Sequence, residues 1–184
     1  MPITSSRSRL GTRDGTAPAA LTLPDLLEAG GAALQAGRWH QAVEAFRGVL
    51  RLAPDLGEVH AALGSALLVL GRAGEAIPAL AEAARILDDS EAWNNMGWAC
   101  SVGQRHEEAR AAFVKAIERD PENLDPQRNL AALFELLGML PEAGAAYALI
   151  LLTAPADREA LAGRARCART GAVQETRPVA ILAA

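Results

Sequence analysis

The sequence predicts an all-α fold in which four helical hairpins stack as a right-handed α-solenoid and a further helix caps the array. Three observations support this prediction. An alanine recurs with a step of 33 or 34 residues, apolar residues within each period keep the spacing of an amphipathic helix, and proline and glycine fall near expected helix ends and turns. The recurring alanines are Ala42, Ala76, Ala109 and Ala143.

The composition is that of one globular domain or a short repeat array. Of the 184 residues, 51% are hydrophobic, 22% charged and 4% aromatic, and this apolar content excludes global disorder. Apolar stretches such as 145–152 are much shorter than the roughly 18 residues of a membrane span, so no span is expected. The first residues contain no apolar segment before a cleavage site, and we therefore expect a cytoplasmic protein without a secretory signal.

The net charge of −4 is unevenly distributed along the chain. Residues 1–22 sum to +2 and residues 158–184 to +3, so residues 23–157 carry −9. An acidic body between basic tails lacks the clustered basic face that binding to a polyanion requires. We therefore expect no nucleic-acid partner.

The elements follow in order along the chain. Residues 1–22 are rich in Ser, Thr, Gly and Pro, which predicts a disordered N-terminal tail. Four units of two helices each then occupy 23–56, 57–89, 90–123 and 124–157. The second unit is one residue short and lacks the proline found near the end of the others.

Within each unit, small residues are expected where the two helices cross. Gly or Ala stands at the eighth position and Ala at the twentieth, and a bulky residue at the twenty-fourth fills the space that they leave. The small residues at the eighth position are Gly30, Gly64, Gly97 and Ala131, and the bulky ones are Phe46, Leu80, Phe113 and Tyr147. Pro126, Pro141 and Pro78 are expected in first turns of helices, and Gly37, Gly71 and Gly138 in the turns between paired helices.

These recurring positions resemble the tetratricopeptide repeat (TPR) family. Its 34-residue unit is a helix-turn-helix with a Trp-x-x-Leu-Gly start, a central Ala, a later aromatic residue and a final Pro. The stretch Trp93-Asn94-Asn95-Met96-Gly97 matches that start most closely, and the resemblance covers residues 23–157. It implies four TPR units whose first helices line a concave groove.

Residues 158–170 resemble the capping helix with which such arrays end. Apolar residues lie on one side and four arginines on the others, so a charged outer face would shield the last unit from water. Residues 171–184 then form a C-terminal tail that ends in an unusually apolar run from Pro178 to Ala184.

No residue pattern indicates catalysis or a bound cofactor. His40, His60 and His106 are not spaced as metal ligands, and Cys100 and Cys167 lie far apart without a Cys-x-x-Cys pair. The sequence contains no phosphate-binding glycine loop, no Gly-x-Ser-x-Gly motif and no Cys-His pair with a plausible third member. We expect a non-enzymatic protein with no metal and no cofactor.

The resemblance implies that positions 2, 5, 6, 9, 12 and 13 of each unit face the groove. The principal candidates for binding a peptide there are Trp98, Asn95, Asn129 and Arg128, supported by Asn94 and Glu91. Asn95 and Asn129 lie one unit apart, so their carboxamides would stack as a short ladder that can bind a peptide backbone.

Alternative interpretations remain open for these residues. The asparagines could make local helix-terminal bonds, Trp98 could pack on the adjacent helix, and the acidic positions Glu58, Glu91 and Asp125 suit the positive ends of helix dipoles. Family members that bind chaperone C-termini use a clamp of Lys, Asn and Arg. The corresponding positions here are Leu27, Gly31, Ala62, Glu91 and Asn95, so such a clamp is not expected.

The sequence favours an adaptor that binds a partner peptide or helix in the concave groove. One alternative is a self-assembling scaffold, a homo-oligomer held by the apolar tail at 179–182 or by the convex face. Another is a secretion or assembly chaperone, because short arrays of this kind resemble such chaperones.

Overall fold

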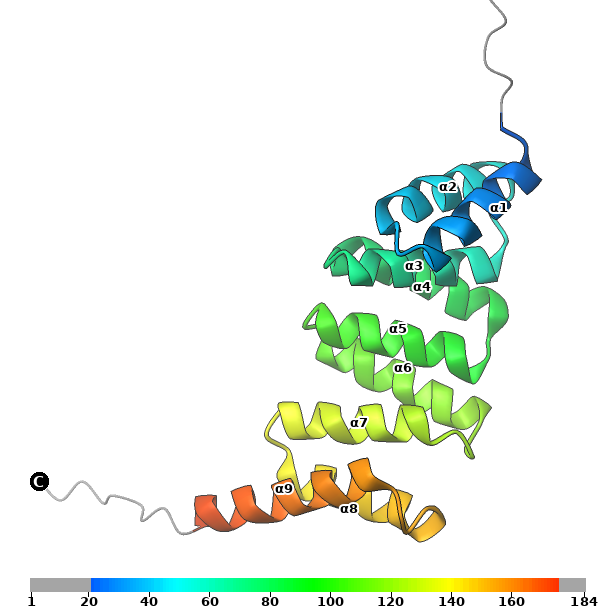
Figure 1. Cartoon of the computed structure of the whole chain (residues 1–184). Helices are drawn as coiled ribbons and strands as arrows, with labels where there is room; N and C mark the ends of the chain where they lie inside the picture. Colours follow the sequence, from blue (N-terminus) through cyan, green and yellow to red (C-terminus); the bar gives the residue numbers. More distant parts are fainter. Residues whose placement is uncertain (1–20, 176–184) are drawn as a thin grey trace, which may run out of the picture.

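The computed structural model describes residues 21–175, and every regular element in that range is a helix (Figure 1). The predicted disordered tail lies outside the described residues except for Leu21 and Thr22, and so does the C-terminal tail beyond residue 175. The helices are α1 (Leu23–Gln35), α2 (Trp39–Leu52), α3 (Gly57–Val69), α4 (Ala73–Leu87), α5 (Ser90–Val102), α6 (His106–Arg119), α7 (Leu124–Leu136), α8 (Leu140–Thr153) and α9 (Arg158–Glu175).

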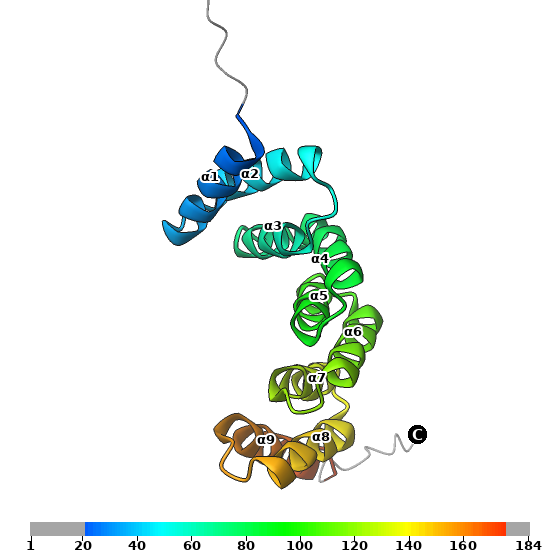
Figure 2. The ribbon, with the colours of Figure 1, turned by 90° about the vertical axis from the view of Figure 1, so that its right-hand side faces the viewer.

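The helices form a curved stack of hairpins. Each even-numbered helix packs against its partner in the hairpin and against the first helix of the next hairpin. Figure 2 shows α1, α3, α5 and α7 on the inner side of the curve and α2, α4, α6 and α8 on its outer side. The predicted all-α stack is therefore confirmed. None of the described helices combines the length and the apolar character that crossing a bilayer would need.

The small residues at the eighth position allow the paired helices to approach closely. A Cβ added at Gly64 would lie 2.4 Å from Leu80 Cγ, and one added at Gly97 would lie 2.6 Å from the Phe113 ring. The four recurring alanines of the second helices have no exposed surface. The small and bulky positions predicted from the repeat thus pack against each other within the hairpins.

The last helix, α9, covers the fourth hairpin. The Asp157 carboxylate accepts a hydrogen bond of 2.8 Å from the Ala160 amide and begins this helix. A Cβ added at Gly163 would lie 2.3 Å from Tyr147 Cζ, so the tyrosine ring packs directly against the α9 backbone. The helix extends five residues past its predicted end at 170. A single glycine at 171 is too weak a helix breaker to stop it, since it costs only about 1 kcal/mol relative to alanine.

Two consecutive aspartates connect the shortened second unit to the third. Asp88 adopts a left-handed backbone conformation with φ of 47° and ends α4. The Asp89 carboxylate then accepts a hydrogen bond of 2.8 Å from the Ala92 amide and begins α5. The connection therefore has two residues, where the other units use four.

The prediction that Pro78 lies in a first turn is wrong. Helix α4 begins at Ala73, so Pro78 is its sixth residue and cannot donate a hydrogen bond to the Gly74 carbonyl. Both Gly74 and Pro78 are exposed on the outer helix, where water can bond a carbonyl that lacks its helical partner.

The turns within the hairpins follow the predicted glycines. Gly37, Gly71 and Gly138 have φ values of 68°, 72° and 74°, a region in which glycine has no steric penalty. In the third unit Gln104 takes this conformation, with φ of 60°. The repeat therefore retains the turn geometry even where the glycine is missing.

Candidate functional site

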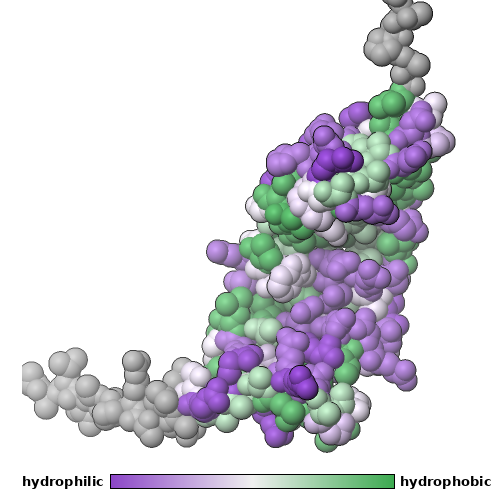
Figure 3. All heavy atoms as spheres, viewed as in Figure 1, coloured by the Kyte–Doolittle hydropathy of each residue, from purple (hydrophilic) through white to green (hydrophobic). Residues whose placement is uncertain are grey.

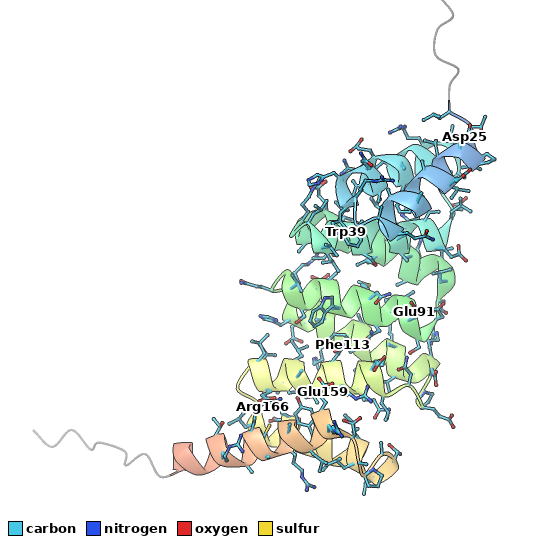
Figure 4. All side chains as sticks on the ribbon, in the orientation of Figure 1. Asp25, Trp39, Glu91, Phe113, Glu159 and Arg166 are labelled. Carbon is cyan, nitrogen blue, oxygen red and sulfur yellow. The ribbon has the colours of Figure 1, made fainter. Side chains whose placement is uncertain are left out.

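All six residues predicted to form a binding site lie on helices of the inner side of the stack. These are Glu91, Asn94, Asn95 and Trp98 on α5, and Arg128 and Asn129 on α7. Figure 4 views this face and labels Glu91 near the start of α5. The third and fourth units thus place the candidates on two adjacent parallel helices.

Trp98 is the most exposed of the three tryptophans. Its side chain is 52% exposed, although the adjacent residues Gly97 and Ala99 are buried. Further exposed aliphatic residues stand at the C-terminal ends of the inner helices: Val69 on α3, Val102 on α5 and Leu136 on α7. We call Val69, Trp98, Val102 and Leu136 the apolar row. Large exposed apolar side chains gathered on one face are typical of interaction surfaces.

Carboxylates occupy the opposite ends of the same helices. Glu58, Glu91 and Asp125 stand at the second position of α3, α5 and α7, and all three are exposed. We call these three residues the acidic row. In Figure 3, which views this face, hydrophobic residues gather on the left side of the middle of the stack and hydrophilic ones toward the centre and right.

A hollow of about 300 Å³ lies between α3 and α5 at the acidic row. Its polar lining consists of Glu58, Asp89, Glu91 and Asn95, and its apolar lining of Ala61, Leu87 and Ala92. Within the described part of the chain, neither Glu58 nor Glu91 forms an ion pair. Their charges are therefore available to a ligand.

The hydrogen bond between asparagines joins a different pair from the one that their spacing predicts. The Asn129 Nδ2 amide donates a hydrogen bond of 2.9 Å to Asn94 Oδ1, linking α7 to α5. Asn95 instead lines the hollow beside the two glutamates. The predicted ladder joined Asn95 and Asn129, residues 34 apart, but the observed pair is 35 apart because the two parallel helices are offset.

Arg128 forms ion pairs within the chain. Its Nε and Nη2 groups donate hydrogen bonds of 2.9 and 2.7 Å to Asp157 Oδ2, and its Nη1 group bonds Asp125. The guanidinium of Arg128 lowers the pKa of the Asp157 carboxyl below its ordinary value of 3.8. Because Asp157 also begins α9, Arg128 joins the inner helix α7 to the capping helix.

Sequence reasoning missed two further inter-unit networks. Glu135 accepts hydrogen bonds of 2.7 and 2.9 Å from Arg166 and one of 3.1 Å from the Tyr147 hydroxyl. Asp88 similarly accepts bonds of 2.9 Å from Arg119 and 2.8 Å from the Trp93 indole. The charged partners in both networks are 31 residues apart, so opposite charges separated by just under one repeat would have indicated them.

The described residues contain no group of three or more His, Cys, Asp and Glu side chains arranged to hold a metal ion. His60 Nε2 lies 2.8 Å from the Pro54 carbonyl oxygen, which links α3 to the segment that precedes it. Cys100 and Cys167 are free and buried, and burial raises the pKa of both thiols. Neither sulfur therefore has the character of an activated nucleophile.

Comparison with protein families gives two matches, both to models described as tetratricopeptide repeat. One covers residues 33–96 and the other residues 90–123. No curated protein sequence matches the chain.

Several solved structures share the fold. A MamA crystal structure is 19% identical, with a TM-score of 0.75 over 83% of this chain and 84% of that one. YrrB, described as a TPR protein with an unusual peptide-binding site, is 22% identical, with a TM-score of 0.72 over 78% and 74%. The first TPR domain of Spaghetti (RPAP3), solved with the HSP90 peptide SRMEEVD, is 20% identical, with a TM-score of 0.59 over 63% and 93%.

Proposed function

This chain belongs to the tetratricopeptide repeat family, and from that premise we propose that it is a non-enzymatic adaptor that holds a segment of a partner protein on its inner face. The observation that carries the proposal is Trp98, a tryptophan 52% exposed on the central inner helix. Burying an indole of this kind against a ligand contributes about 2–3 kcal/mol. Tryptophan is also among the residues most often found to dominate binding energies at interfaces.

The other candidates supply polar contacts around this anchor. Asn95 and Glu91 line the hollow beside α3. The Asn95 carboxamide can donate and accept hydrogen bonds with a bound segment, and the Glu91 carboxylate can accept them. The Asn94 and Asn129 carboxamides bond each other through one donor and one acceptor, which leaves each amide further bonding capacity toward a ligand. Arg128 acts mainly by holding α7 and α9 together, since two aspartates already share its guanidinium.

Similar structures support a peptide ligand, but the carboxylates on the inner helices here favour a ligand of a different charge. YrrB is described as having a peptide-binding site, and the RPAP3 domain is bound to an acidic peptide. Glu58 and Glu91, which form no ion pair in the described part of the chain, would repel such an acidic peptide here. We therefore propose a partner segment that is not acidic.

The test compares capture of partners by tagged full-length chain and two variants. Trp98→Ala removes the exposed indole, and Leu152→Ala is the matched control because Leu152 is an apolar residue 78% exposed on the outer helix α8. Partners should be recovered from native lysate by the parent chain and by Leu152→Ala, and be strongly reduced with Trp98→Ala. If all three proteins recover the partners equally and have the same helical circular dichroism, the proposal that partners bind on the inner face through Trp98 is refuted.

A second candidate function is self-assembly through the outer face. Leu149 and Leu152 are exposed on α8, and Leu149 borders an apolar hollow of about 240 Å³ that Ile117, Leu130 and Ala146 also line. If copies associate there, light scattering should show an oligomer that Leu149→Ser/Leu152→Ser converts to a monomer and Trp98→Ala leaves intact. A monomeric parent chain would exclude this alternative.

A further inference from the structure

We infer that the segment held on the inner face is an amphipathic α-helix with one basic and one apolar side, lying along the stack across α3, α5 and α7. This inference rests on the proposed function. It follows from the arrangement of the acidic row and the apolar row, from the side chains between them, and from the charge of this face.

The two rows are in register over three successive helices. Glu58 precedes Val69 by eleven residues, Glu91 precedes Val102 by eleven, and Asp125 precedes Leu136 by eleven. Eleven residues are close to three turns, so both members of each pair lie on the same side of their helix. At about 1.5 Å per residue the rows are roughly 16 Å apart and run parallel to the stack.

The space between the rows suits the body of a helix. On α3 it is lined by the small side chains of Ala61, Ala62 and Ser65, and on α7 by Ala132 together with Arg128 and Asn129, whose polar groups bond other residues of this chain. A helix with its side chains is about 10–12 Å across, so it fits between rows that are roughly 16 Å apart. The long basic side chains of the bound helix would reach the acidic row, while the apolar side of that helix would contact the apolar row.

An extended ligand fits this floor less well than a helix. Each residue of an extended chain needs partners for its backbone amide and carbonyl, whereas a helix satisfies these groups internally. Between the rows, Asn94 and Asn129 use part of their bonding capacity on each other and Arg128 is paired with Asp157, so an extended segment would find fewer partners than it has backbone amides and carbonyls. The inner face therefore offers an apolar contact and a charge contact, but few partners for a peptide backbone.

The carboxylates that the described residues leave unpaired in the acidic row indicate that one side of the ligand is basic. Glu58 and Glu91 have no cationic partner among the described residues, and residues 23–157 carry −9 overall. A lysine or arginine on the ligand would satisfy these carboxylates and speed association.

The pattern also limits the length of the ligand. The position eleven residues after Glu159 of α9 is Thr170, and the second and thirteenth positions of α1 are Pro24 and Gln35, so neither end helix continues both rows. Three helices spaced by about 10 Å span roughly 20 Å, the length of about 13 helical residues.

Three synthetic peptides of 18 residues test this inference on the full chain by fluorescence anisotropy. The first forms a helix with Leu on one side and Lys on the other, and the second has the same composition in strict alternation, which favours an extended chain. The third is the corresponding helix of Leu and Glu. We expect the Leu/Lys helix to bind roughly tenfold more tightly than either of the others.

Variants then locate the contact. Trp98→Ala should weaken binding of the Leu/Lys helix by roughly tenfold, and Glu58→Gln/Glu91→Gln by about fivefold with a smaller salt dependence. The matched control is Glu118→Gln/Glu142→Gln, which removes the same charge from exposed positions on the outer helices α6 and α8 and should change affinity less than twofold.

The inference is overturned if the alternating peptide binds as tightly as the helix, if both glutamate double variants bind alike, or if no peptide binds. The lysate experiment separates this failure from failure of the proposed function. If Trp98→Ala loses the partners but the Leu/Lys helix does not bind, the proposed adaptor function stands and the basic helical ligand is excluded. Partners retained with Trp98→Ala would exclude the adaptor groove itself.

Discussion

Arg128 on α7 and Asp157 at the start of α9 form a partly buried ion pair, with 2.7 Å between Arg128 Nη2 and Asp157 Oδ2. The Asp157 side chain is only 8% exposed, and its second oxygen accepts the hydrogen bond that begins α9. A carboxylate in this position depends on its cationic partner, so the pair attaches the capping helix to the repeat beneath it.

Arg128→Leu should therefore destabilise the protein by about 1–3 kcal/mol, because it leaves the Asp157 carboxylate largely buried without its partner. Urea unfolding followed by circular dichroism measures the change. The control is Arg110→Leu, which breaks the solvent-exposed pair between Arg110 and Glu107 and should cost less than about 1 kcal/mol. Equal effects of the two substitutions would show that the α9 ion pair has no special role.

The difference between the parent chain and Arg128→Leu should depend on pH. Arg128 lowers the pKa of Asp157 in the folded protein, whereas the unfolded chain has the ordinary value of 3.8. The stabilisation is therefore complete above pH 3.8 and is lost as the pH falls through the lowered folded value. Urea midpoints measured from neutral pH downward should converge below pH 3.8. A constant difference across that range would contradict the assignment.

Gly64→Ala should destabilise the second hairpin. The new Cβ would lie 2.4 Å from Leu80 Cγ in a fully buried position, and overpacking of this kind costs about 1–3 kcal/mol. Gly31→Ala is the matched control, because nothing lies within 4 Å of the added atom and alanine favours a helix by about 0.5–1 kcal/mol. Thermal unfolding should thus move in opposite directions for the two variants. A stabilising Gly64→Ala would indicate that the helices can separate without cost.

Tyr147 should ionise only at strongly alkaline pH. Burial, reinforced by the adjacent Glu135 carboxylate, raises its pKa to about 12. The protonated phenol therefore stabilises the fold below the ordinary value of 10.0, and this contribution is lost as the pH rises toward 12. The chain has one tyrosine, so tyrosinate absorbance reports this residue directly. A native titration at pH 10, the value expected in concentrated urea, would show that the ring is not buried under α9.

Most of the fold could be predicted from residue types at recurring positions. Ala109 and Phe113 are buried, and Gly97 accommodates the Phe113 ring, because the repeat requires close helix crossings. Pro78 could not be placed correctly, since its position in the helix depends on where α4 begins, and Arg72, which precedes Ala73, forms no side-chain cap that would fix that residue.

The candidate site could be predicted only as a set of residues on one face. The repeat positions assign Trp98, Asn95 and Arg128 to inner helices, and the structure has them there. That Arg128 bonds Asp157 could not be predicted from the repeat, because Asp157 belongs to a connecting segment whose conformation depends on how α9 docks.

The sequence by itself determined the helical hairpins, the buried small and bulky positions, and the inner face that carries Trp98, because a period of 34 residues and the helical spacing within it assign residues to faces. Only the tertiary structure decided that Asn129 bonds Asn94 and that Arg128 joins α7 to α9. The physical reason is that periodicity defines the direction of a side chain, whereas its partner depends on the offset between neighbouring helices and on the rotamers that packing allows.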